Sequence, residues 1–118
     1  MSTPKIVNDE MYQLLREEKI AEFNQRRAKG EAVHFAGLDF RGLDLRGIQA
    51  DNIVFSNGYF RQTDLRGVDL STCRMDGASI CNAKISGTYF PAQLSAQEIM
   101  LSLSHGTRMR ARANKSVG

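Results

Sequence analysis

Every fifth residue of this chain is apolar over a run that extends from Phe35 to Phe90. The run has twelve members without a break: Phe35, Phe40, Leu45, Ala50, Phe55, Phe60, Leu65, Leu70, Met75, Ile80, Ile85 and Phe90. A period of five matches neither the two-residue period of a strand nor the 3.6-residue period of a helix. It indicates an internal repeat, and a repeat is the sequence feature to consider first when the architecture of a chain is predicted.

This period predicts a chain that turns a corner within every five residues. In a straight strand, residues i and i+5 point to opposite faces, so burial at every fifth position requires a regular bend. Four such bends close a coil of about twenty residues, and successive coils would stack at the strand spacing of about 4.8 Å. We therefore expect residues 33–92 to form about three coils of a solenoid, in which each coil contacts its neighbours.

The remaining positions of the repeat support this bend. The residues two places before the buried centres are apolar or small, as a second inward position requires. The residues two places after the centres are mainly Gly and Asn, which accept turn geometry at low cost. Charged side chains flank the centres and must face water: Asp39, Asp44, Asp64 and Asp69 before them, and Arg41, Arg46, Arg61 and Arg66 after them.

These residues resemble the pentapeptide-repeat family, whose pattern is Ala-Asp/Asn-Leu-X-X. The nearest units are Leu38-Asp39-Phe40-Arg41-Gly42, Leu43-Asp44-Leu45-Arg46-Gly47, Thr63-Asp64-Leu65-Arg66-Gly67 and Val68-Asp69-Leu70-Ser71-Thr72. The resemblance covers residues 33–92 and implies an all-β solenoid, a right-handed quadrilateral β-helix of about three coils. We expect residues 1–118 to form a single domain around it.

Both flanks of the repeat are predicted to cap the solenoid, because its raw ends would expose strand edges and core. Residues 8–30 read as a helical cap with Asn8 as N-cap, either one curved helix or two short ones. Residues 95–105 read as a C-terminal helix in which Ser95 and Glu98 form a capping box. Its apolar patch is predicted to cover the last coil or to meet a second copy of itself: Ile99, Met100 and Leu103.

The C-terminal residues 107–118 read as a basic flexible tail. The net charge of the chain is +3, and all of it lies in residues 93–118, which carry four cations and the single acid Glu98. The four cations are Arg108, Arg110, Arg112 and Lys115. The tail is either solvated or makes electrostatic contacts with an acidic partner or phosphate. Without interleaved aromatic residues, the pattern argues against nucleic acid as a partner.

No catalytic constellation is visible in the sequence. His34 and His105 lie on opposite flanks of the repeat, no Cys/His spacing fits zinc, and no glycine-rich phosphate loop is present. Cys73 occupies an inward position and Cys81 an outward one, so we expect two reduced thiols. We expect no enzyme activity and no cofactor.

The chain has no apolar run near the ~18 residues of a membrane helix and no signal-peptide layout, so we expect a cytoplasmic bacterial protein without membrane association. We expect a non-catalytic protein-interaction or scaffold module with an unidentified protein partner. Its predicted interaction face consists of Arg41, Arg46, Arg61 and Arg66. By family resemblance, a homodimer through the C-terminal helix is also expected.

Three other functions stay open at this point. Some members of the family imitate DNA and bind gyrase, but the short repeat and basic charge of this chain argue against that role. Direct nucleic-acid binding through the tail would depend steeply on salt. A secreted bacterial effector is neither supported nor rejected by the sequence.

Overall fold

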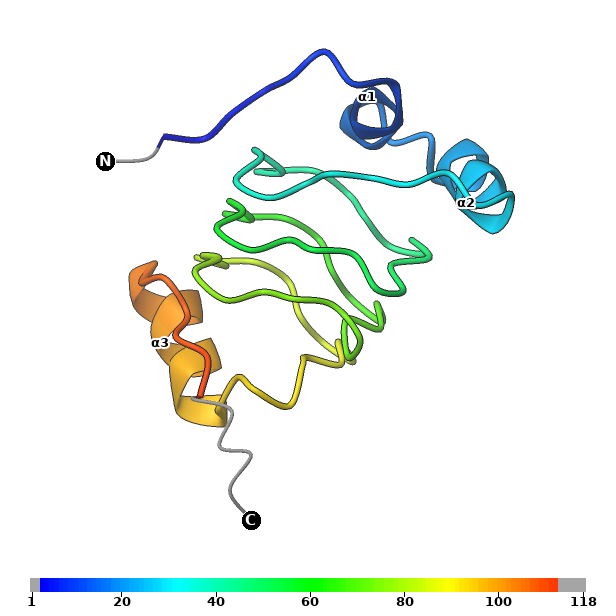
Figure 1. Ribbon diagram of the computed structural model, residues 1–118. Coiled ribbons are helices and arrows are strands. Elements are labelled where there is room, and N and C mark those ends of the chain that lie inside the picture. Colours follow the sequence, from blue (N-terminus) through cyan, green and yellow to red (C-terminus); the bar gives the residue numbers. More distant parts are fainter. Residues whose placement is uncertain (1–2, 113–118) are drawn as a thin grey trace.

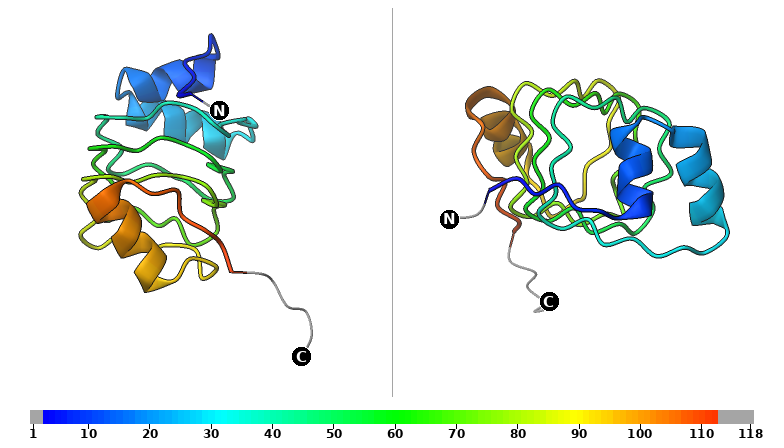
Figure 2. Two further views of the ribbon diagram at one scale, coloured as in Figure 1. Left: turned by 90° about the vertical axis from the view of Figure 1, so that its left-hand side faces the viewer. Right: turned by 90° about the horizontal axis from the view of Figure 1, so that it is seen from above.

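The structure is a computed structural model, and it describes residues 3–112. The described chain has three helices: α1 (Glu10–Arg16), α2 (Ile20–Ala28) and α3 (Ala96–His105). Between α2 and α3 the chain winds into stacked coils (Figure 1). The first two helices lie over one end of the stack, and α3 lies beside the last coil (Figure 2).

Adjacent coils are joined by isolated parallel β-bridges between residues twenty apart in the chain. These bridges fall in four columns: Asp39–Tyr59–Ser79, Asp44–Asp64–Lys84, Val54–Arg74 and Asp69–Tyr89. In the first column, Phe40 N donates to Tyr59 O over 2.8 Å, and Tyr59 N donates to Leu38 O over 3.0 Å. The period of five therefore produces a coil of twenty residues.

The expectation of an all-β chain is only partly met, because residues 3–112 contain no continuous strand. The corner after each buried centre limits every extended stretch to the length of one bridge. The turn position explains this limit, because every residue there from Gly37 to Gly87 has a positive φ except Thr72. Asn57 adopts a φ of 61° at this position, a conformation that asparagine tolerates better than most residues.

The predicted register of the core is confirmed for most of the repeat. Ten of the twelve centres, from Phe35 to Ile80, are at most 2% exposed. Ile85 and Phe90 in the last coil are only partly buried. Four aromatic rings fill the first two coils, with Phe40 stacked on Phe60 at a centroid distance of 5.1 Å and Phe35 facing Phe55 at 6.0 Å.

The N-terminal cap consists of α1 and α2, which are separated by a turn in which Glu18 has a φ of 59°. The N-cap of α1 is Asp9, whose carboxylate accepts a hydrogen bond from Tyr12 N, so the assignment to Asn8 is wrong. Tyr12 and Phe23 are fully buried on the first coil, where the Tyr12 ring packs edge-on against Phe40 at 5.5 Å. The stacked rings of Phe35, Phe40, Phe55 and Phe60, which we call the aromatic column, thus continue into the cap.

The cap and the segment before α1 supply acceptors for three backbone N–H groups of the first coil, which are five residues apart. Asp39 N donates to Lys5 O over 2.9 Å. Asp44 N donates to the Glu18 carboxylate over 2.7 Å, and Gln49 N donates to the Asn24 side chain over 2.8 Å. These contacts give acceptors to three backbone N–H groups that no further coil could pair.

The C-terminal edge of the last coil is closed along a shorter stretch. Gly77 N donates to Met109 O, Ile80 N to Ser102 Oγ and Asn82 N to Leu103 O, over 2.7, 2.9 and 3.0 Å. Beyond these residues, the backbone N–H groups of Ile85, Gly87 and Phe90 have no acceptor within residues 3–112. Within residues 3–112, the C-terminal edge of the solenoid is therefore paired along a shorter stretch than the N-terminal edge.

The register makes a direct prediction for stability. Phe60→Ala should lower the free energy of unfolding by about 3–5 kcal/mol, because it opens a cavity inside the aromatic column. Arg61→Ala, one residue on and exposed, should change it by no more than about 0.5 kcal/mol. Urea denaturation followed by circular dichroism measures both values. Equal effects of the two substitutions would contradict the register.

Candidate functional site

The outward arginines of the repeat are held by aspartates two residues earlier in the chain. Arg41 binds the Asp39 carboxylate through Nε and Nη2, both at 2.9 Å. The pair of Arg46 with Asp44 and the pair of Arg66 with Asp64 repeat this geometry at 2.9 and 2.7 Å. We call each such unit an Asp-x-Arg clip. A clip neutralises its own charge and fixes both side chains in a planar, two-point contact.

One clip also crosses between coils. Arg46 Nε lies 3.4 Å from Asp64 Oδ2 in the next coil, in addition to its contacts with Asp44. The Arg66 hydrogen bonds, together with the nearby Arg46 charge, lower the pKa of Asp64 from its ordinary value of 3.8 to about 2. Arg46 therefore separates two carboxylates that stack in one bridge column.

Arg61 departs from this arrangement because the residue two places before it is Tyr59 rather than an aspartate. Its Nη1 lies 3.7 Å from Cys81 Sγ, and it has no carboxylate partner within residues 3–112. Tyr59 instead contacts Arg108, whose Nη2 lies 2.6 Å from Tyr59 Oη and whose guanidinium lies 5.2 Å from the ring centre. The predicted face of four arginines therefore divides into three clipped residues and Arg61.

Arg61 lines a surface pocket of 420 Å³, which we call the Arg61 pocket. Among its lining residues are Arg41, Tyr59, Arg61, Ser79, His105 and Arg108. The pocket brings two members of the predicted face together with one cation of the predicted tail. Arg46 and Arg66 belong to the neighbouring bridge column and do not line it.

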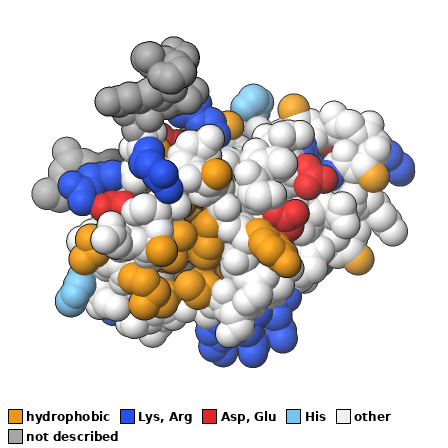
Figure 3. Space-filling view, turned by 90° about the horizontal axis from the view of Figure 1, so that it is seen from below, with side chains coloured by type: hydrophobic (Ala, Val, Ile, Leu, Met, Phe, Trp, Pro, Cys, Tyr) orange, Lys and Arg blue, Asp and Glu red, His pale blue; other side chains and the backbone are white. Residues whose placement is uncertain are grey.

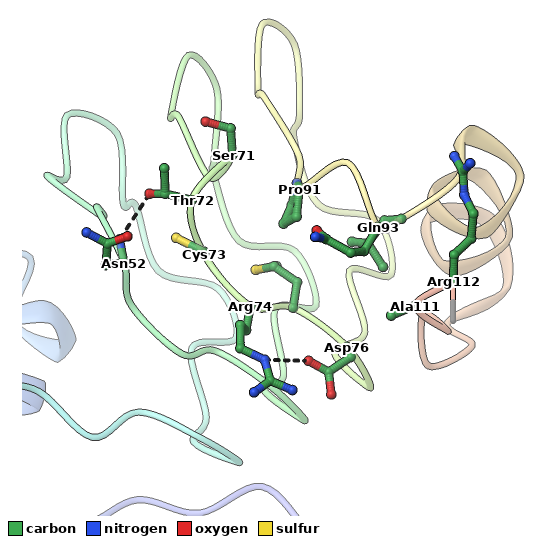
Figure 4. A pocket seen from close by; sticks show the side chains of 12 residues that line it. Asn52, Ser71, Thr72, Cys73, Arg74, Asp76, Pro91, Gln93, Ala111 and Arg112 are labelled. Atoms are coloured by element: carbon green, nitrogen blue, oxygen red, sulfur yellow. Dashed lines mark hydrogen bonds and ion pairs between the residues drawn. The ribbon is translucent and has the colours of Figure 1, made fainter. Parts of the chain in front are cut away.

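A second pocket, of 560 Å³, lies between the coils and the segment after α3 (Figure 4). Its lining includes an ion pair between Arg74 and Asp76 at 3.6 Å. Cys73 also lines it, but burial raises the pKa of this thiol to about 11, and Sγ contacts Ala50 O at 3.0 Å. A thiol held protonated in this way is a poor nucleophile.

Residues 107–112 do not form the predicted flexible tail. Met109 is fully buried, its N donates to Ala78 O and its O accepts from Gly77 N. Arg110 binds the Glu98 carboxylate at 2.6 Å, which removes that side chain from the predicted capping box. Arg112 N donates to Gln93 O. The prediction of a flexible tail is therefore wrong for residues 107–112, because the buried Met109 anchors this segment. Lys115 lies outside the described residues.

The predicted patch on α3 divides into two sides. Ile99 and Leu103 pack against the core, and the fully buried Ser102 lies between them in the chain. Met100 is 54% exposed and its neighbour Leu101 is 41% exposed. Ser95 is confirmed as the N-cap, and the C-cap is Gly106 at a φ of 73°. The sequence patch did not include Leu101, which follows Met100 in the chain and is exposed like it.

Comparison with known families gives one match. The family model described as pentapeptide repeats, with 8 copies, matches residues 34–71 and 55–90. The chain belongs to the pentapeptide-repeat family. Against individual proteins, no curated protein and no solved structure matches the chain.

The described part of this pentapeptide-repeat protein offers no cluster for metal chemistry. Within residues 3–112, no group of three or more His, Cys, Asp or Glu side chains could hold an ion. His34 and His105 are both exposed, and Cys73 and Cys81 are both free thiols. None of the helices in the described range has the length and apolar character needed to span a bilayer.

The Asp64 clip predicts an acid-dependent stability. A carboxyl whose pKa is lower in the folded than in the unfolded chain stabilises the fold above the unfolded value, and the contribution is lost as pH falls towards the folded value. Wild-type urea midpoints should therefore decline as pH falls through 3.8 towards about 2. Asp64→Asn should be less stable at pH 7 and should show a shallower decline.

Asp51→Asn is the matched control, because the Asp51 side chain makes no ion pair within the described residues. It should retain the wild-type decline. A decline of the same steepness in Asp64→Asn would contradict the contribution of the clip.

Proposed function

We propose that this protein is a non-catalytic interaction module built on the right-handed quadrilateral β-helix of its family. The observation that carries the proposal is the filled interior of the coils, where the centres from Phe35 to Ile80 leave no room for a substrate. The polar groups that could recognise another molecule stand outside, on positions fixed by the bridges between coils. Such a surface suits a protein partner better than a small substrate.

The proposed interaction face contains Arg41, Arg46, Arg61 and Arg66. Their Cα positions are fixed by two neighbouring bridge columns, so a partner would meet a preorganised set of side chains. Arg41, Arg46 and Arg66 are about half exposed although they are clipped, which leaves part of each guanidinium accessible. Arg61 differs from them in lacking a carboxylate among the described residues.

Imitation of DNA is a weaker proposal for this chain. A protein that replaces duplex DNA needs a long surface of negative potential, because the duplex carries a dense row of phosphates. Here Asp39, Asp44 and Asp64 are each neutralised by an arginine two residues later. Gyrase supercoiling that remains normal at excess protein would exclude this role.

Affinity capture from a lysate of the native organism tests the proposed function. The wild-type protein should retain one protein in near-stoichiometric amount. Capture by the double variants Arg46→Gln/Arg66→Gln and Arg41→Gln/Arg61→Gln should be weaker, because both remove exposed cations of the proposed face. Arg74→Gln, an exposed arginine in a different bridge column, is the control and should capture normally. Recovery of nothing above the background of the support would contradict the proposal.

We also propose a homodimer through the C-terminal end. At this end the N–H groups of Ile85, Gly87 and Phe90 have no acceptor within residues 3–112, and the Ile85 and Phe90 side chains are only partly buried. Figure 3 shows hydrophobic side chains gathered in the middle of the same end. Met100 and Leu101 extend apolar surface over α3. Exposed apolar groups beside an open edge favour association.

Light scattering at high micromolar concentration tests the dimer. The wild type should give about twice the chain mass of 13.2 kDa, and Leu101→Glu should give 13.2 kDa, because a charge in an apolar interface opposes association. Val54→Glu is the control, since Val54 is also 41% exposed but lies in the second coil. A wild-type mass of 13.2 kDa would exclude the dimer.

A further inference from the structure

Among the four arginines that directly follow a buried centre, Arg61 alone lacks a clip within residues 3–112. Four units place an arginine directly after a buried centre, and in three of them an aspartate precedes that centre. In each of these three, the guanidinium binds a carboxylate through two nitrogen atoms at 2.7–2.9 Å. The chain therefore shows, three times, which ligand an arginine at this position accepts.

Arg61 occupies the same position on the same framework. Tyr59, two residues before it, bridges Asp39 in one coil and Ser79 in the next, as Asp64 bridges Asp44 and Lys84. The backbone thus places Arg61 as it places Arg66, but the internal carboxylate is replaced by a phenol. The fork of donors on the Arg61 guanidinium is left for a carboxylate from outside the described residues.

The surroundings of Arg61 are also unusual in charge. No aspartate or glutamate lines the Arg61 pocket, whereas Arg41, Arg61 and Arg108 all do. Each of the four other surface pockets described contains at least one carboxylate, namely Asp76, Asp51, Glu18 with Asp44, and Glu98. An anion entering the Arg61 pocket would therefore meet Arg61 and Arg108 without a competing acid in the lining, whereas Arg41 is already paired with Asp39.

Two further contacts prepare the pocket for a ligand. The Arg108 guanidinium is held over the Tyr59 ring, and its Nη2 is hydrogen-bonded to Tyr59 Oη, so its position is fixed before any ligand arrives. Ser79 Oγ lies 3.1 Å from Gly106 O, which ties the segment after α3 to the third coil beside the pocket. Preorganised donors lose little conformational freedom on binding.

We propose that the Arg61 pocket binds an aspartate or glutamate side chain from an acidic segment of the protein partner, with Arg61 completing the carboxylate contact that the other three arginines make internally. The proposal rests on the proposed function and adds the chemistry of the partner to it. Tyr59 has two roles in this proposal: it stands where the clipped units have an aspartate, and it orients Arg108.

Fluorescence polarisation with a labelled hexaglutamate peptide tests the proposal. The wild type should bind it saturably at low salt, and a hexaglutamine peptide should not bind. Arg61→Ala should weaken binding about tenfold, as expected for loss of a charge-assisted two-point contact. Arg74→Ala removes the same charge from another bridge column and should bind within about twofold of the wild type.

Tyr59→Asp provides a test that keeps Arg61 in place. Aspartate is native to the equivalent positions 39, 44 and 64, so the fold should accept it, and the unchanged circular dichroism melt of the variant checks this. The new carboxylate should close a fourth clip on Arg61 and abolish peptide binding. A structural effect of Arg61→Ala alone would not produce this loss.

Several outcomes would overturn the proposal: no binding by the wild type, an equal loss in Arg74→Ala, or full binding by Tyr59→Asp. Binding of a phosphoserine peptide without binding of hexaglutamate would overturn the assignment to carboxylates. The proposed function has a separate outcome. A stoichiometric partner captured from the lysate equally well by wild type and Arg61→Ala would leave the interaction module standing and exclude this pocket as its site.

Discussion

The burial of one side chain in every five residues controls the rest of this structure. Burial at that spacing forces a corner into each repeat, and the corner in turn limits backbone pairing to single bridges between coils. The stability of the coils therefore comes from the stacked interior more than from continuous strands. Phe35, Phe40, Phe55 and Phe60 form a continuous cluster of ring contacts inside the first two coils.

The two ends of the solenoid are covered by different kinds of contact. At the N-terminal end, the cap supplies both aromatic rings for the core and acceptors for three N–H groups of the first coil. At the C-terminal end, α3 and the segment through Met109 cover one side, and Ile85 and Phe90 stay partly exposed. Interior bulk also falls along the repeat, from Leu38 and Ile48 at the second inward position to Ala78 and Ala83.

The sequence predicted the parts of the structure that depend on local pattern. The register of Phe35 to Ile80 and the N-cap Ser95 follow from residue spacing and residue type alone. The burial of Met109 could not be predicted, because it depends on Gly77 and Ala78, about thirty residues earlier, meeting the segment after α3. The period of twenty also predicted that Asp44 and Asp64 lie in adjacent coils. It did not show that Arg46 forms ion pairs with both carboxylates.

The clips have a consequence for recognition. An ion pair closed within one repeat unit leaves little net field, and exposed pairs of this kind contribute little energy to a partner's approach. A regular solenoid built wholly from such units would therefore have a nearly uniform exterior. The proposed function therefore requires specificity from units that lack a clip, such as the unit that has Tyr59 where Asp39, Asp44 and Asp64 stand in the clipped units. Tyr59 leaves Arg61 without a carboxylate partner within residues 3–112 and positions Arg108, so this one residue affects the surroundings of two cations.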